Sequence, residues 1–164
     1  MLWAKLSHDR MQSVYLQIFD EIIVKNHNPE LATREVFIRA EILKRNFSKR
    51  QLTILAFIGT FSYMYGKESA IIPKLKDFEI AGISITKIAD ELKKLEGMNV
   101  ITWYRGKDTN EFSINDPREW QADYHSIYND IRSRELFLLN LKDAGTPYEI
   151  VSQIEKGIAE DKYR

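Results

Sequence analysis

The sequence contains no cysteine, and only 4 of its 164 residues are proline and 7 are glycine. The absence of cysteine excludes disulfide bonds, thiolate metal ligands and a cysteine nucleophile, and it is typical of proteins of the reducing cytoplasm. The low proline and glycine content, together with 44% apolar and 29% charged residues, excludes a collagen-like or disordered chain. The composition therefore predicts a globular protein that folds without disulfides or structural metals.

Long hydrophobic runs are missing as well. The N-terminal stretch MLWAKLSHDRMQSVYLQIF is interrupted by Lys5, His8, Asp9 and Arg10. It is therefore neither a signal peptide nor a membrane span. We expect a soluble, cytoplasmic protein.

Motifs of catalysis and metal binding are also absent. The histidines His8, His27 and His125 are scattered without metal-ligand spacing, and the sequence has no nucleophile elbow, phosphate loop or HExxH helix. Adjacent carboxylates such as Asp90 and Glu91 are expected on solvated surfaces. The sequence thus predicts no cofactor and no metal, and it favours a protein that is not an enzyme. A site built from residues distant in the sequence stays open.

The net charge is zero, but the charged residues are unevenly distributed. Residues 34–107 carry 14 basic and 8 acidic side chains, a net charge of +6, whereas residues 1–33 and 108–164 carry net charges of −1 and −5. A basic middle followed by an acidic tail favours a module that binds a polyanion, joined to a segment with another role.

Hydrophobic periodicity predicts helices over most of the first 80 residues. The first helix is expected to end in a loop at 25–29, and the second to run from about Thr33 to Arg45. Ser48 and Gln51 have the spacing of a capping box at the start of a third helix, which is predicted to end at Gly66. The β-branched run SAIIP then predicts a brief strand, and a short helix follows over residues 76–80.

The stretch GISITKIADELKKLEGMNVITW, residues 82–103, combines a turn, a helix and the start of a strand. Ile85, Ile88, Leu92 and Leu95 recur at spacings of three and four, which predicts one buried and one free helical face. Asn99 tolerates the left-handed conformation that ends helices. Two β-rich runs around the turn at 105–108 then predict a hairpin.

The order helix, strand, helix, turn, helix, hairpin is that of a winged helix-turn-helix. The predicted fold class is therefore mostly α with a small β-wing, plus flanking helices. We expect an N-terminal helical segment over residues 1–33, the winged-helix domain over 34–116, and a C-terminal helical appendage over 117–164.

In such a fold the helix that begins near Ile85 presents its N-terminal residues to base edges in the major groove, while basic residues of the wing meet phosphates. Lys93 and Lys94 have an alternative interpretation as the solvated face of an amphipathic helix. The residues predicted to contact double-stranded DNA are Lys74, Lys76, Ser84, Thr86, Lys87, Lys93, Lys94, Tyr104, Arg105 and Lys107.

Two stretches resemble the N-terminal domain of phage replication proteins of the O type and of replisome organisers. FIRAEILKRNFSKRQLTILAFIGTFSYMYGK is similar to the family's opening, in which a Ser or Thr starts a long helix, and GISITKIADELKKLEGMNVI resembles its turn and recognition helix. The resemblance covers roughly residues 34–115. It implies a phage or prophage protein that binds a replication origin and helps to recruit the replicative helicase or its loader.

Two alternatives stay open, a winged-helix transcriptional regulator and a winged-helix module that binds proteins but no DNA. The second is favoured by the neutral net charge and by Ile85, Ala89 and Asp90, which stand where such helices usually carry Arg, Ser or Thr. The cations Arg105 and Lys107 in the wing oppose it.

The tail is predicted to form two further helices. Asp116 and Pro117 open the first, which carries a stripe of bulky residues at helical spacing that either packs on the core or forms a dimer or partner surface. That stripe consists of Trp120, Tyr124, Ile127, Tyr128 and Ile131.

The last helix is predicted from the run Gly145 to Glu149, which supplies an N-cap, a proline at the first helical position and a glutamate. Its apolar face is expected to cover either the first helix or a partner. The residues of that face are Ile150, Val151, Ile154 and Ile158.

Overall fold

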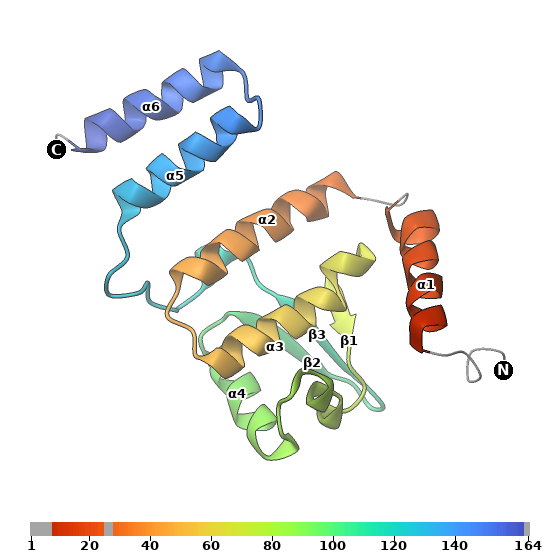
Figure 1. The fold of residues 1–164 in the computed structure, drawn as a ribbon. Helices are drawn as coiled ribbons and strands as arrows, with labels where there is room; N and C mark the ends of the chain where they lie inside the picture. The colour runs from red at the N-terminus through yellow and green to blue at the C-terminus, as the bar shows by residue number, and fades with distance from the viewer. Residues whose placement is uncertain (1–7, 25–27, 163–164) are drawn as a thin grey trace. The chain divides into compact units, whose positions relative to one another are not determined.

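The computed structural model describes residues 8–24 and 28–162, and its contacts divide the chain into two compact units, residues 1–124 and 125–164 (Figure 1). Unit 1 contains α1 (His8–Ile18), the π-helical turn η2 (Phe19–Val24), α2 (Pro29–Lys44), α3 (Lys49–Thr60), the 3-10 turn η3 (Tyr63–Tyr65), β1 (Ser69–Ile71), the 3-10 helix η4 (Leu75–Ala81), α4 (Ile85–Gly97), β2 (Ile101–Arg105), β3 (Asn110–Ile114) and the 3-10 turn η5 (Pro117–Glu119). Unit 2 contains α5 (Asp130–Asp143) and α6 (Tyr148–Lys162).

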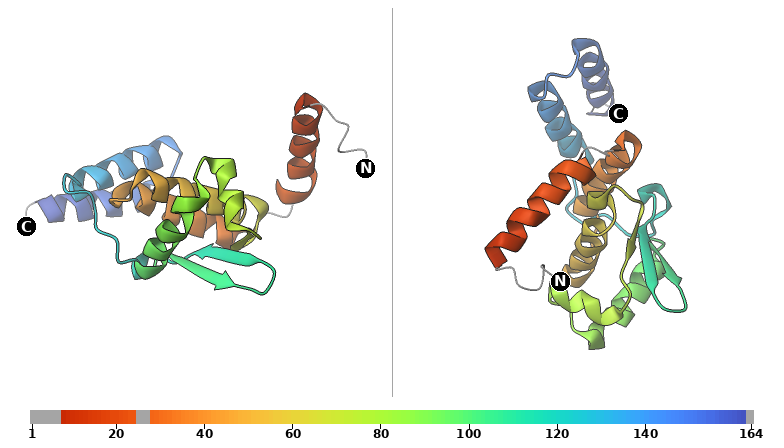
Figure 2. Two further views of the ribbon diagram at one scale, coloured as in Figure 1. Left: turned by 90° about the horizontal axis from the view of Figure 1, so that it is seen from below. Right: turned by 90° about the vertical axis from the view of Figure 1, so that its right-hand side faces the viewer.

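A small antiparallel sheet lies within this mostly α fold, which confirms the predicted fold class. Its strand order is β1-β3-β2, so the short strand β1 pairs with the hairpin that follows α4. Phe112 of β3 lies opposite both Ala70 and Trp103, and all three point toward the core. Figure 2 shows β2 and β3 projecting from the rest of the unit as a wing.

The core of unit 1 is centred on α3. Ile54, Leu55 and Ile58 are fully buried, and α3 contacts α4, η4 and two of the three strands. The predicted capping box is present, since Ser48 Oγ accepts from the Gln51 N–H at 3.2 Å and the Gln51 side chain accepts from the Ser48 N–H at 2.9 Å. The sequence therefore specified correctly where this helix begins.

The predicted end of this helix at Gly66 is wrong, because α3 ends at Thr60. The Ser62 hydroxyl donates to the Ile58 carbonyl at 2.7 Å, and the Phe61 N–H is shared between two carbonyls. These bonds tighten the chain into the 3-10 turn η3, which ends at Gly66 with φ +72°. A side chain that bonds to the backbone four residues earlier competes with continuation of the helix.

The second helix begins earlier than predicted, at Pro29. The Asn28 side chain accepts from the N–H groups of Glu30 and Leu31, and proline occupies the first turn, where its missing N–H costs nothing. Most of the loop predicted at 25–29 lies outside the described residues. No helix within the described residues is both long and apolar enough to cross a membrane.

The helix predicted to start at Pro117 is also wrong. Only the turn η5 forms there, and the next helix, α5, begins at Asp130. The Trp120 indole N–H donates to the Asn115 carbonyl at 2.9 Å, and its buried ring packs edge-on against Phe47. Residues 120–124 are not helical: the Asn46 N–H donates to the Asp123 carbonyl at 2.8 Å, and Tyr124 forms an isolated antiparallel bridge with Arg45.

The stripe predicted on that helix is therefore not a continuous helical face. Trp120 belongs to the core of unit 1, whereas the exposed fractions of Tyr124 and Ile127 are 46% and 92%. Tyr128 precedes α5, and Ile131 lies within it. Bulky residues can recur at helical spacing by chance, and here hydrogen bonds to the α2–α3 connection decide the conformation.

Arg45 holds residues 122–124 next to the end of α2. Its guanidinium donates to the Ala122 carbonyl at 2.8 Å and to Glu41 Oε1 at 2.9 Å, and it lies 4.4 Å from the ring centroid of Tyr124. Burial alone would raise the pKa of Glu41, but hydrogen bonds from Arg45 and Lys44 outweigh burial and leave this pKa below its ordinary value. The Glu41 carboxylate is therefore charged although it is buried.

Unit 2 is a hairpin of two helices. Leu138 of α5 is buried against Val151 and Ile158 of α6, with Ile154 partly buried beside them. The last helix forms as predicted after Pro147. The expectation that its apolar face covers the first helix or a partner is wrong for these three α6 residues, because they pack on α5.

We predict that Arg45→Met lowers the free energy of unfolding by about 3 kcal/mol, because it leaves the Glu41 carboxylate buried without its main partner. Urea denaturation measures the change. The double variant Glu41→Leu/Arg45→Met should regain part of the loss, since no buried charge then remains. A double variant no more stable than the single one would show that the lost contacts of Arg45 with Ala122 and the aromatic rings, not the stranded charge, cause the effect.

Candidate functional site

The site is built on α4, which the predicted turn and cap position. Gly82 has φ +81°, a left-handed conformation that glycine adopts without strain, and the chain then enters the helix at Ser84. Ser84 Oγ accepts from the Thr86 N–H at 3.3 Å. Ile88 and Leu92 are fully buried against the core, so the direction in which α4 presents its other residues is fixed.

The outer face of α4 is polar and exposed. Ile85, the one large apolar residue on it, has an exposed fraction of 45%. Lys94 lies 3.8 Å from Glu91 in an i,i+3 pair, whereas Lys87 and Lys93 form no ion pair within the described residues. The predicted contact residues that lie exposed on α4 and its cap are Ser84, Thr86, Lys87, Lys93 and Lys94.

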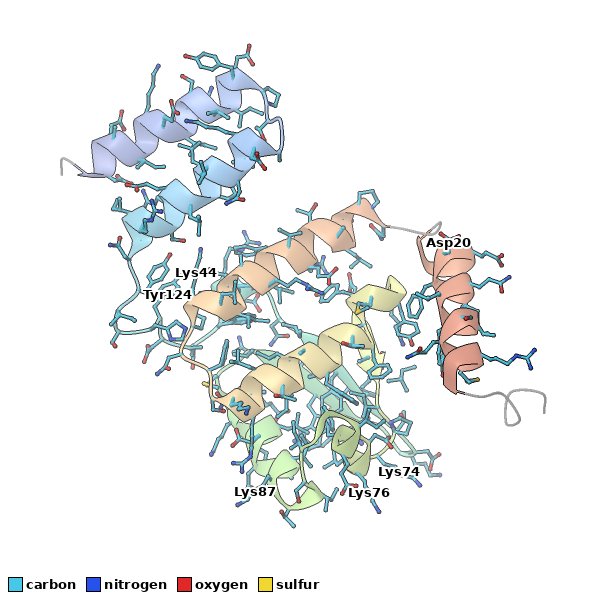
Figure 3. The ribbon with its side chains drawn as sticks, in the orientation of Figure 1. Asp20, Lys44, Lys74, Lys76, Lys87 and Tyr124 are labelled. Carbon is cyan, nitrogen blue, oxygen red and sulfur yellow. The ribbon has the colours of Figure 1, made fainter. Side chains whose placement is uncertain are left out.

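The helix η4 adds two more of the predicted cations to the same end of the unit. Lys74 and Lys76 are exposed, and the Lys74 N–H donates to Asp77 Oδ2 at 2.9 Å, which fixes the start of η4. Figure 3 shows the side chains of Lys74, Lys76 and Lys87 at one end of unit 1, where η4 and α4 are in contact. The structure thus brings together residues from two neighbouring elements.

The wing carries the remaining three predicted residues. Tyr104 has an exposed fraction of 67%, and Lys107 is exposed in the turn between β2 and β3. The Gly106 N–H donates to the Thr109 carbonyl at 2.9 Å and closes this turn, and a Cβ on Gly106 would lie 2.9 Å from the same oxygen. Tyr104 and Lys107 are therefore presented on a short hairpin of defined shape.

Arg105 differs from the other predicted cations, because it is held by its neighbours. Its two terminal nitrogens donate to the two carboxylate oxygens of Glu96 at 3.0 and 3.2 Å, and its guanidinium carbon lies 3.7 Å from the ring centroid of Trp103. The hydrogen bond to Glu96 is the main reason that the pKa of Arg105 lies above its ordinary value. This pair was not predicted from the sequence, since Glu96 lies on α4 and Arg105 on β2.

Two further cations at this site were not predicted. Lys49 and Arg50 are exposed in the first turn of α3 and line a groove of about 440 Å³ with Gly82, Ile83 and Glu91. The available signal was the Ser48 cap directly before them, which places both at an exposed helix start. Glu91 Oε2 is buried beside this groove and accepts no hydrogen bond within the described residues.

Metal ligation has no support in the part of the chain that the structure describes. Among residues 8–24 and 28–162, no group of three or more His, Cys, Asp or Glu side chains is arranged to hold a metal ion. The chemistry that this site offers is hydrogen bonding and electrostatic attraction from exposed hydroxyls and ammonium groups.

The fold and the site together define a small, mostly α protein with a β-wing, in which the helix after the turn at Gly82 presents a polar face. The sequence matches the family described as bacteriophage replication protein O over residues 30–120, more than half of the chain. The protein belongs to this family, which assigns it a role in phage replication. The match spans α2 to η5 and leaves α1, α5 and α6 outside it. No curated protein and no solved structure matches the chain.

We predict opposite effects for the same substitution at the two ends of α4. Gly82→Ala should lower the free energy of unfolding by about 1 kcal/mol, because alanine is strained at φ +81°. Gly97→Ala should raise it by about 0.5 kcal/mol, because Gly97 is helical and no atom lies within 4 Å of the added methyl group. Urea denaturation of both variants tests the turn geometry, and equal effects would contradict it.

Proposed function

We propose that this protein binds double-stranded DNA at a phage replication origin, with α4 in the major groove and the wing on the sugar-phosphate backbone. The observation that carries the proposal is the group of exposed lysines at one end of unit 1. Lys74, Lys76 and Lys87 form no ion pair with a carboxylate within the described residues, so their charges are available to phosphates. Membership of the replication protein O family supports the proposal independently.

The proposed division of labour follows from what each side chain offers. Ser84 and Thr86, at the start of α4, would reach base edges, since recognition helices contact bases mainly with their N-terminal residues. Lys93 and Lys94 lie further along the helix, where phosphate contact is the expected role. On the wing, Lys107 would bind a phosphate in the same way.

Asp90 also lies on the exposed face of α4 and would repel phosphates. A carboxylate in the major groove can accept a hydrogen bond from the amino group of cytosine. Asp90 lies between Thr86 and Lys93 in α4. Close approach of α4 to the DNA is therefore favoured only at sequences that place a cytosine beside this carboxylate. This effect suits a protein that must distinguish an origin from other DNA.

Unit 2 is the part for which we propose a protein partner, the replicative helicase or its loader. The hairpin of α5 and α6 leaves three large apolar side chains of α5 exposed by more than half, namely Leu136, Phe137 and Leu139. Residues 125–164 carry 7 acidic and 6 basic side chains, a net charge of −1, so unit 2 has no excess of positive charge to attract DNA. Exposed apolar side chains without an excess of positive charge suit binding to a protein.

The duplex-binding proposal predicts that neutralising the lysine group weakens binding. In the variant Lys74→Gln/Lys76→Gln/Lys87→Gln, the logarithmic salt dependence of affinity should become shallower by about 2.7, since each phosphate contact contributes about 0.9 on B-DNA. Fluorescence anisotropy with a labelled duplex across a salt series measures this slope, with single-stranded DNA measured in parallel.

Lys156→Gln on α6 is the matched control, because Lys156 is exposed and belongs to unit 2, which the proposal does not place on DNA. It should leave the slope unchanged. Absence of duplex binding by the wild-type protein at low salt would overturn the proposal in favour of a module that binds only proteins. Specific binding confined to a promoter would favour a transcriptional regulator.

The recruitment proposal predicts that Phe137→Ser/Leu139→Ser in the full chain prevents capture of the purified helicase or loader and leaves duplex affinity unchanged. Both side chains are more than half exposed, so the substitutions should not disturb the packing of α5 on α6. Co-purification on an immobilised protein measures capture. Retained capture by this variant would remove α5 from the proposed contact.

A further inference from the structure

The Arg105 side chain is arranged as an anion receptor. The flat guanidinium lies on the Trp103 ring, and its two terminal nitrogens each donate to a different oxygen of Glu96. Two parallel N–H donors directed at two oxygens of one anion is the geometry with which arginine binds both carboxylates and phosphates. The Glu96 carboxylate thus lies where a phosphate of DNA would bind.

The aromatic support for Arg105 does not depend on Glu96. The Trp103 indole N–H donates to Asn110 Oδ1 at 3.0 Å, across the hairpin. Its ring also stacks on the fully buried Phe112, with centroids 5.6 Å apart. Because these two contacts hold the Trp103 ring in place, the Arg105 guanidinium can still pack on this ring after Glu96 is displaced.

We propose that Arg105 is a phosphate-binding residue of the wing and that Glu96 occupies its anion position in the free protein, so that DNA must displace Glu96 to use Arg105. The proposal rests on the proposed function, since the displacing anion is a phosphodiester of duplex DNA. It assigns Glu96 a regulatory role, because the carboxylate neutralises the wing until a phosphate takes its place.

The ion pair is exposed enough for such an exchange. The Arg105 and Glu96 side chains have exposed fractions of 49% and 37%, so water and salt ions reach both partners. Ion pairs in this environment are weak and screened by salt. A DNA backbone offers many phosphates at high local density, whereas Glu96 offers one carboxylate, and the exchange needs only a change of side-chain rotamer in Glu96.

A purely structural role for Glu96 predicts the opposite sign. If the pair served to hold the wing against α4, its loss would misplace the wing and weaken DNA binding. If Glu96 competes with phosphate, its loss should tighten binding, and only while Arg105 is present. The sign and its dependence on Arg105 therefore separate the two roles.

The test is a double-mutant cycle in the full chain with Glu96→Gln, Arg105→Gln and the combination of both. Anisotropy with a labelled duplex of random sequence gives the affinity between 50 and 200 mM salt. Across this range each phosphate contact accounts for about a threefold loss of affinity. Glutamine keeps the shape of Glu96 and removes its charge. Thermal unfolding midpoints check that each variant is folded.

We expect Glu96→Gln to tighten duplex binding by about threefold or more at low salt, because no carboxylate then has to be displaced from Arg105. In the Arg105→Gln background the same substitution should have little effect. The matched control is Asp90→Asn, an acid-to-amide change on the same helix without a paired arginine, whose effect should be equal with and without Arg105.

Each other outcome is decisive. Duplex binding by the wild type with equal or weaker binding by Glu96→Gln overturns the exchange and leaves the proposed function intact. A gain that persists in the Arg105→Gln background reduces Glu96 to a general negative charge, which also overturns it. Binding by Glu96→Gln alone would support the exchange, and no binding by any variant would overturn both proposals.

Discussion

The burial of α3 is the constraint on which the rest of unit 1 depends. Ile54, Leu55 and Ile58 are shielded from water on several sides, so α4, η4 and the sheet must each pack against a different side of the same helix. An apolar side chain of this size gains about 1.5–3 kcal/mol on full burial. The loops between the packed elements are short, and the order of elements in the chain therefore determines their positions in space.

The packing around α3 also determines what is left for binding. Because Ile88, Leu92 and Leu95 of α4 pack against the core, Asp90 and Lys93 between them face outward. The same applies to the wing, in which Trp103 points inward and Tyr104 outward, since side chains alternate along a strand. The proposed DNA-binding surface thus consists of the residues of α4 and the wing that do not pack in the core, and the packing of the core alone determines its orientation.

Local signals made the starts of α3 and α4, the wing hairpin and the last helix predictable from the sequence. The capping box at Ser48 and the turn before α4 involve residues within a few positions of each other, so their spacing carries the information. Residues 117–131 were mispredicted because their conformation depends on Arg45, which lies about 75 positions earlier and binds the backbone of Ala122. The ion pair between Glu96 and Arg105 was also not predicted, because its two side chains come from two separate elements and their spacing in the sequence does not indicate a contact.

Arginine and lysine have different roles in unit 1, and their chemistry explains why. Arg34, Arg39 and Arg45 each pair with a glutamate, and Arg45 also bonds to backbone carbonyls, which suits a planar group with five directed donors. Lysine is a flexible point charge that loses more by being fixed. The exposed lysines of η4 and α4 can therefore contact the backbone of any DNA sequence. In the proposed complex, the short side chains at the start of α4 distinguish one DNA sequence from another. The cap at Ser84 and the buried face of the helix determine the positions of these side chains.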